Sequence, residues 1–427
     1  MGEPHRSVVA ILKAVRELIE QKRAHPPMPS KQDVKDQIEI LGQYVILSHR
    51  WDDEELSFAD VENFSDPLVR AKKGFQKLAA FSKTVERDYG CRYIWMDTVC
   101  ISEEARNRSI PLMFGWYRRA YVCVVYLTDP GHPEREGPQD PWFTRGWTLQ
   151  EVLAAPRINV SKTHSSGEGW HPHRSGTSIF SACRDNPEIP ISSNIVHSIP
   201  RSFDWFHYEP GLESALPLFK EMIHRETKRP EDKVYCLLSA LNVDIPIMYG
   251  EGLDHAFYRL QAHYLTQTYD RRCLLWPDTR PSPWNSMLAA GFDAYSDRSI
   301  GQYRSIVDAG SLPDPSISLD EGGVMRIMAS LFPWKDLPYY PSQRDSRSKT
   351  PQEPDLVFAS LHFLYSERYY GVLLRPIPPT RLRAIVKNFQ DHIDSDHVVY
   401  ERVSLKVFPK SELPFHEFVK PEWIYIR

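Results

Sequence analysis

The stretch Tyr44–Trp51, which reads YVILSHRW, decides how the first half of the chain folds. Its first four residues are apolar, and short apolar runs of this kind are typical of strands buried on both faces of a sheet. The polar residues Ser48, His49 and Arg50 follow at once. The sequence therefore predicts a buried strand that places polar side chains at its carboxyl end.

Further strands and helices alternate along the next hundred residues. Tyr93–Asp97 and Val122–Leu127 read as apolar strands, and Ile158–Val160 reads as a shorter one. Apolar spacing and capping residues predict helices between them, over about 66–90, 102–119 and 145–154. This alternation predicts a parallel sheet with helices on both faces, and in such sheets ligands bind beyond the carboxyl ends of the strands.

The first of these helices has a clear start and an apolar face. Asp66 is a good capping residue, and Pro67 suits the first helical position. The residues expected to form the inner face recur at helical spacing, and they are Leu68, Ala71, Phe75, Leu78, Ala79 and Val85.

The chain is expected to divide into four parts. An N-terminal extension, 1–39, contains an amphipathic helix over 7–24, and the α/β core occupies 40–163. Residues 164–272 read as an irregular loop followed by a helical segment. Short apolar stretches alternate with turn residues from 273 to 427, which predicts a β-rich C-terminal domain.

Composition and charge narrow the classes of partner. The 427 residues carry a net charge of −4, so neither nucleic acid nor an anionic membrane is expected as a partner. No apolar run is long enough to span a membrane, and no signal peptide is visible. The six cysteines form no C-x-x-C pair, which favours reduced, buried thiols and a cytoplasmic location.

Three segments in fixed order resemble the HET (heterokaryon incompatibility) family of filamentous fungi. They are Tyr44–Trp51, Tyr93–Ile101 (YIWMDTVCI) and Trp142–Glu151 (WFTRGWTLQE). Two later segments, Arg229–Leu238 and Ile247–Gly252, resemble stretches that often follow a HET core. The resemblance implies self/non-self recognition and programmed cell death, with self-association and an unknown partner or sensor protein. One departure is Asp52, which stands where the family usually has glycine.

The HET core in turn resembles a TIR domain, which implies a flavodoxin-like parallel sheet. Leu47-Ser48 followed by Arg50 is similar to the opening of a TIR chain, and Trp147-x-x-x-Glu151 is similar to its later Trp-x-x-x-Glu motif. That glutamate is the catalytic residue of TIR enzymes that cleave NAD. The resemblance therefore implies Glu151 as the catalytic residue, with Ser48, Arg50 and Trp147 as candidates for substrate binding.

Position at the carboxyl edge of the sheet adds Trp51 and Asp97 to the candidate substrate-binding residues. Cleavage of the nicotinamide–ribose bond generates positive charge on the ribose, which one carboxylate can stabilise. Arg50 is suited to hold the pyrophosphate. NAD would be the substrate, and no cofactor is expected.

Other interpretations remain open. Glu151 can be a structural residue near a helix start, Arg50 can pair with a neighbouring carboxylate, and Asp97 can cap a turn. The core can then act as a non-enzymatic signalling module, or bind another small molecule. No metal site is expected, because the candidate zinc ligands match no strong spacing pattern; they are His164, His171, His173 and Cys183. Phosphate-binding P-loops and common hydrolase motifs are missing from the sequence.

Overall fold

The computed structural model resolves the chain into two compact units, which are described separately. Unit 1 comprises residues 1–209 and 225–227, and unit 2 comprises residues 210–224 and 228–427. The structure describes the following residues within them: 32, 42–127, 140–162, 181–183, 208–211, 215–276, 281–296, 307–308, 316–320, 323–337, 355–365, 368–378, 380–382, 398–409 and 420–427.

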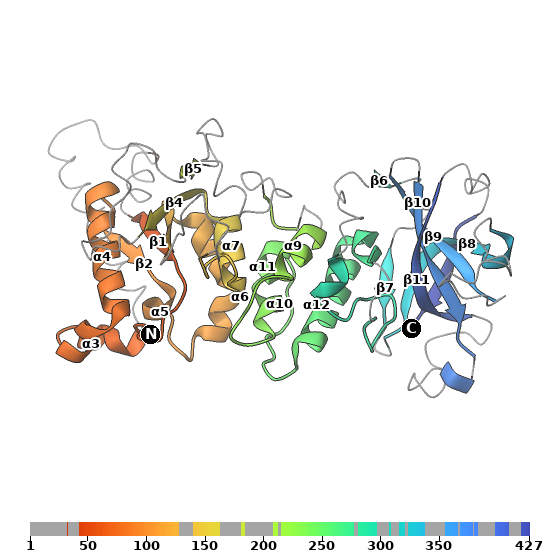
Figure 1. The fold of residues 1–427 in the computed structure, drawn as a ribbon, viewed down its shortest axis with the longest axis horizontal. Coiled ribbons are helices and arrows are strands. Elements are labelled where there is room, and N and C mark those ends of the chain that lie inside the picture. Colours follow the sequence, from red (N-terminus) through yellow and green to blue (C-terminus); the bar gives the residue numbers. More distant parts are fainter. Residues whose placement is uncertain are drawn as a thin grey trace. The chain divides into compact units, whose positions relative to one another are not determined.

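Unit 1 is built on a sheet whose order is β2-β1-β3-β4-β5 (Figure 1). The first four strands run parallel, as the sequence predicts, and β5 joins the edge in the antiparallel direction. The strands are β1 (Tyr44–Ser48), β2 (Tyr93–Trp95), β3 (Val122–Leu127), β4 (Arg157–Lys162) and β5 (Ser181–Cys183).

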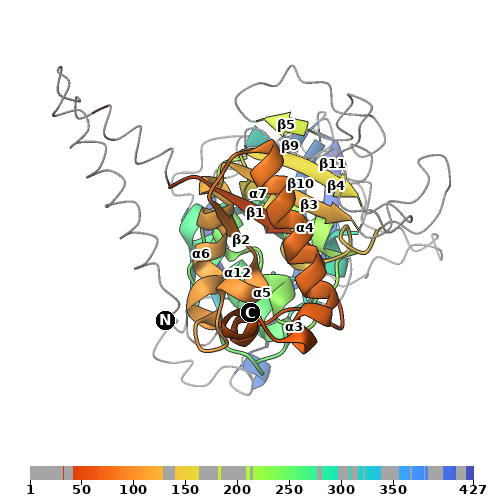
Figure 2. The same ribbon diagram turned by 90° about the vertical axis from the view of Figure 1, so that its left-hand side faces the viewer.

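Helices cover both faces of this sheet, and Figure 2 shows α4 and α6 on either side of the strands. On one face, Phe81 and Val85 of α4 pack against Val45 and Leu47 of β1. On the other face, α7 approaches the last residue of β1. The helices of unit 1 are η1 (Phe58–Asn63), α3 (Pro67–Ala71), α4 (Lys73–Asp88), α5 (Asp97–Cys100), α6 (Arg106–Arg119) and α7 (Gly146–Ala154).

The helix predicted over 66–90 is two helices. Asp66 caps α3 by accepting a hydrogen bond from the Leu68 backbone at 2.8 Å, but Lys72 adopts an extended backbone with ψ of 141°. This break turns the following helix, so the predicted inner face is wrong at Leu68 and Ala71, whereas Leu78 and Val85 do pack in the core. Leu68 is 78% exposed, whereas Lys77 of α4 is buried.

Two further boundaries differ from the predictions. Asp97 does not end a strand, because β2 stops at Trp95 and Asp97 is the first residue of α5. The next helix, α6, begins at Arg106 and not at 102, although the Ser102 hydroxyl does accept a hydrogen bond from the Ala105 backbone at 3.3 Å.

Unit 2 begins with short helices around an aromatic core. Phe219 of α9 packs against Phe257 of α12 with ring centroids 5.2 Å apart, and Phe292 and Tyr295 complete the cluster. The helices are α9 (Ala215–Met222), α10 (Asp232–Tyr235), α11 (Leu238–Leu241), α12 (Leu253–Thr268), η3 (Arg271–Leu274) and η4 (Phe292–Tyr295). The predicted helical segment before the C-terminal strands is therefore confirmed.

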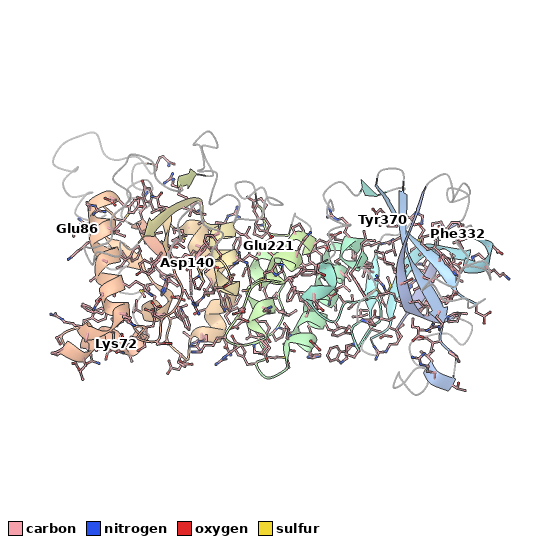
Figure 3. All side chains as sticks on the ribbon, viewed as in Figure 1. Lys72, Glu86, Asp140, Glu221, Phe332 and Tyr370 are labelled. Carbon is pink, nitrogen blue, oxygen red and sulfur yellow. The ribbon has the colours of Figure 1, made fainter. Side chains whose placement is uncertain are left out.

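The C-terminal part of unit 2 is a sheet of order β6-β9-β10-β11-β12-β8-β7. It closes on itself, because β8 also pairs with β9. Figure 3 labels Phe332 and Tyr370 on this sheet, and Phe332 packs there with Trp334, Phe358 and Leu373. The elements are β6 (Val307–Asp308), β7 (Ile317–Leu319), β8 (Met325–Pro333), η7 (Trp334–Asp336), β9 (Val357–Tyr365), β10 (Arg368–Pro376), β11 (Val399–Pro409) and β12 (Glu422–Ile426).

Some predictions concern residues outside the described ranges. These are the helix over 7–24, the irregular loop from 163 to 180 with its three histidines, and the side chain of Cys183. Among the described residues, no helix combines the length and the apolar character needed to cross a membrane.

Candidate functional site

The centre of the site is a contact between Ser48, the last residue of β1, and Glu151 of α7. The Ser48 hydroxyl donates a hydrogen bond to Glu151 Oε2 at 2.5 Å and accepts one from the Trp142 indole at 2.8 Å. The Tyr117 hydroxyl, on α6, donates to the Leu47 carbonyl at 3.1 Å. Glu151 is only 2% exposed, so these neighbours are its immediate surroundings.

Burial changes the acidity of Glu151. Removal from water raises the pKa of this carboxyl to about 7, and the negative charge of Asp97 acts in the same direction. The Arg145 charge, the hydrogen bond from Ser48 and the nearby Tyr117 hydroxyl oppose the rise in pKa without cancelling it. Near pH 7 both the protonated and the ionised form of the Glu151 carboxyl are therefore populated.

Asp97 is the second buried carboxylate of the site. It accepts hydrogen bonds from His49 Nε2 at 2.9 Å, from the Trp51 indole at 2.8 Å and from the Thr98 backbone at 2.8 Å. Burial alone would raise its pKa, but the contact with His49, the nearby Arg145 and the Trp51 indole lower the pKa of Asp97 to about 2. Asp97 is therefore an anion throughout the physiological pH range.

The strand geometry sends Ser48 and His49 to opposite faces of the sheet. Consecutive side chains of a strand alternate in direction, so Ser48 meets α7 while His49 meets α4. On that second face, Lys77 Nζ lies 3.2 Å from His49 Nδ1. The other ring nitrogen of His49, Nε2, lies 2.9 Å from Asp97 Oδ1, so the imidazole ring bridges Lys77 and Asp97.

Lys77 also joins α4 to the loop that follows β1. Its buried ammonium lies 2.7 Å from Glu55 Oε2 and 2.9 Å from Asp52 Oδ2, and it donates to the Arg50 carbonyl at 3.2 Å. A buried cation with paired carboxylates and backbone acceptors fixes the positions of all the groups it contacts. The loop is thereby held in one arrangement beside Asp97.

The positive charge of Arg145 lowers the pKa of both carboxyl groups. Its guanidinium stacks over the Trp51 ring, 4.7 Å from the centroid, and Nη2 lies 4.0 Å from Asp97 Oδ2. The backbone around Arg145 is fixed by a bridge to Glu226, whose N–H donates to the Thr144 carbonyl at 2.6 Å. Arg225 adds a hydrogen bond to the Arg145 carbonyl at 2.8 Å.

The structure brings some of the predicted site residues into direct contact and leaves others apart. It joins Ser48 directly to Glu151, and Trp51 directly to Asp97. Trp147 lies on α7 and is half-buried. Arg50 is exposed, and its carbonyl is the atom that takes part in the network; the neighbouring carboxylate of Asp52 pairs with Lys77 and not with Arg50.

Five residues of the site were not predicted from the sequence. His49, Trp142 and Arg145 lie inside the quoted motifs, so the motifs themselves carried the signal. Tyr117 lies on α6 and Lys77 on α4, where a single aromatic or basic side chain gives no distinguishing pattern. They are found only through their hydrogen bonds to β1 and to the loop after it.

Comparison with known families identifies the part of the chain that contains β1, β2 and β3. The family model for "Heterokaryon incompatibility protein (HET)" matches residues 44–138, from the start of β1 to beyond β3. The chain carries a HET domain. Ser48, Arg50, Trp51 and Asp97 lie within the residues matched to this HET domain, whereas Trp147 and Glu151 follow them.

The chain is also similar to a curated protein, the "Vegetative incompatibility protein HET-E-1" of Podospora anserina. It is 32% identical over 233 residues, which are 51% of this chain and 16% of the relative. The chain thus corresponds to a small part of that protein's length. No solved structure matches the chain.

Metal ligands and thiols complete the inventory of reactive groups. Within the described residues, no group of three or more His, Cys, Asp or Glu side chains is arranged to hold a metal ion. Cys123, Cys236 and Cys273 are buried, as predicted. The prediction is wrong for Cys100, which is exposed because it ends the short helix α5. Its thiol pKa is raised, which disfavours the reactive thiolate.

Proposed function

We propose that this chain is a heterokaryon incompatibility protein whose HET domain adopts a TIR-like fold and hydrolyses NAD through Glu151. The family match and the name of the relative support the first part. The strand order β2-β1-β3-β4 supports the second, since flavodoxin-like sheets begin in this order. The same proposal places the protein in the cytoplasm, where loss of NAD would lead to programmed cell death.

The observation that carries the enzymatic proposal is the position of the Glu151 carboxyl. It lies where β1 ends, at the point of the sheet where the strand order reverses, and such points are where ligands bind in open α/β sheets. Its pKa of about 7 is suited to proton transfer at neutral pH. A titratable group with strongly shifted pKa at a sheet edge is typical of a functional site.

The reaction requires little machinery. The bond between ribose C1′ and the nicotinamide nitrogen breaks, and its electron pair stays with the nicotinamide, which leaves as a neutral molecule. Ionised Glu151 stabilises the positive charge that forms on the ribose. Water oxygen bonds to C1′, Glu151 accepts the water proton, and the products are nicotinamide, ADP-ribose and a proton released to solvent.

A second candidate function is a non-enzymatic signalling module that acts by self-association and partner recruitment. The observation that favours it is the low exposure of Glu151, which is 2%, together with the complete burial of Ser48. In that case the Ser48–Glu151 contact fixes α7 against β1, and the HET domain acts through its surface.

Release of nicotinamide from NAD by the purified full chain distinguishes these functions. We expect release by the wild type and a loss of at least about a hundredfold in Glu151→Gln, because the variant keeps the volume and loses the charge. Glu86→Gln is the matched control, since Glu86 is an exposed glutamate of α4 (Figure 3). Equal release by Glu151→Gln and the wild type would exclude catalysis by Glu151, and no release by any variant would favour the signalling module.

A further inference from the structure

Asp97, Trp51 and Arg145 together form an arrangement of complementary charge. Asp97 supplies a buried negative charge, and the Trp51 indole donates a hydrogen bond to it at 2.8 Å. The Trp51 ring is 36% exposed, and the Arg145 guanidinium lies over its face. An anion beside an aromatic face is the combination that proteins use to bind organic cations.

The orientation of Asp97 is fixed from behind. His49 Nε2 donates to Asp97 Oδ1 at 2.9 Å, and the Thr98 backbone donates to the same oxygen at 2.8 Å. These two contacts fix the orientation of the carboxylate, so that Oδ2 lies on the side of Trp51 and Arg145. Oδ1 accepts from His49 and Thr98, whereas Oδ2 accepts only from Trp51 and keeps one position for a second contact.

Arg145 faces that position without being firmly bound there. Its Nη2 lies 4.0 Å from Oδ2, which is too long for a hydrogen bond. Its Nε is buried and has no hydrogen-bond partner. Buried polar groups are nearly always paired, so an unpaired guanidinium nitrogen marks an arrangement that a competing cation can replace at low cost.

We propose that Asp97 and Trp51 form a receptor for a planar organic cation, and that Arg145 fills this receptor within the chain until a ligand displaces it. Resting on the function proposed above, the ligand is the pyridinium ring of oxidised nicotinamide nucleotide. The ring is flat enough to stack on the indole, and its positive charge faces Asp97. The reduced nicotinamide ring is neutral, so the receptor selects oxidised over reduced nucleotide.

Two probes of almost equal shape, one cationic and one neutral, measure how much the positive charge of the ligand contributes to binding. The cation 1-methylnicotinamide and the neutral molecule nicotinamide are titrated into the purified full chain by calorimetry. We expect the cation to bind at least about tenfold more tightly than the neutral molecule, the ratio typical of one favourable contact with a partly buried aromatic ring and an anion. Trp51→Leu should reduce this ratio to about one.

A second variant, Arg145→Gln, is expected to bind more tightly than the wild type, a result that a misfolded protein would not give. Arg145→Gln removes the competing guanidinium, so it should increase the affinity for 1-methylnicotinamide several-fold and the affinity for nicotinamide by less, because the neutral ring gains no attraction to Asp97. Arg92→Gln is the matched control, since Arg92 is an exposed arginine of the same unit, and it should change neither affinity.

The outcomes separate this receptor from the catalytic proposal. Equal binding of the two probes, or no gain in Arg145→Gln, would overturn the receptor even if the wild type releases nicotinamide from NAD. Tighter binding of the cation together with the gain in Arg145→Gln would establish the receptor, even if no NAD is consumed.

Discussion

Glu151 and Asp97 are two buried carboxyl groups whose surroundings move their pKa values in opposite directions. Burial raises the pKa of Glu151 to about 7, whereas the pKa of Asp97 falls to about 2 through contacts with His49, Arg145 and Trp51. Pairs of this kind commonly divide chemical roles, with one group exchanging protons and the other staying charged. In the proposed reaction, Glu151 exchanges the proton and Asp97 supplies the permanent charge.

The raised pKa of Glu151 predicts how stability depends on pH. The folded protein binds the Glu151 proton more tightly than the unfolded chain does, so the stabilisation is fully present below pH 4.5 and is lost as the pH rises through about 7. Between pH 4.5 and 8 the wild type should therefore lose roughly 3 kcal/mol of its free energy of unfolding through Glu151, and Glu151→Gln should not lose it. Urea titrations at several pH values measure this difference.

A pH-independent difference between Glu151→Gln and the wild type would contradict this assignment. Glu86→Gln, which removes an exposed carboxyl of the same unit, should show no comparable change with pH. The control separates the effect of Glu151 from the titration of the other carboxyl groups and histidines, which both proteins share.

At the scale of elements, the loop after β1 depends on one lysine of α4. Lys77 joins Asp52, Glu55 and His49 from a buried position. We expect Lys77→Met to lower the free energy of unfolding by about 3 kcal/mol. The substitution removes the ammonium group that pairs with Glu55, a carboxylate that is nearly buried. Chemical denaturation of Lys77→Met beside Lys83→Met, which changes an exposed lysine of the same helix, checks this value. Equal stability of the two variants would show that the network does not hold the loop.

The same helix shows why sequence patterns predicted the elements better than their faces. The four parallel strands of the core were predicted at the right places, because continuous apolar runs such as Val122–Leu127 leave few alternatives, although β2 ends earlier than predicted and β5 was not predicted. The helix over 66–90 was not predicted correctly, because the only nearby signal of the break at Lys72 is Gly74, and an isolated glycine is tolerated within a helix. Lys77 was not among the residues predicted for the inner face, since its partners in the 49–55 loop are more than twenty positions away and helical periodicity does not show them.

The site shows a similar division. Ser48 and Asp97 follow apolar strands, so the sequence places both at the same edge of the sheet. The hydrogen bond between Ser48 and Glu151 joins residues 103 positions apart, and no local pattern specifies it. Whether Glu151, Ser48, Arg50, Trp51, Asp97 and Trp147 act on a substrate stays a prediction.

At the scale of the whole molecule, the described site residues all belong to unit 1, including Arg225 and Glu226 from the segment that returns to it. The β-rich character of the C-terminal region was predicted from alternating short strands. Its closure was not, since the pairing of β8 with both β9 and β12 joins strands far apart in sequence. The proposed division into four parts at 39, 163 and 272 stays a prediction.

The pH dependence of nicotinamide release from NAD by the purified chain tests the central claim most directly. If Glu151 must be ionised to stabilise the ribose cation, kcat/KM should rise about tenfold per pH unit below the pKa of about 7 and level off above it. Ser48→Ala removes a hydrogen bond that lowers this pKa, so its profile should shift to higher pH. A profile that stays flat from pH 5.5 to 8.5, or one that Ser48→Ala leaves in place, would contradict the role of Glu151.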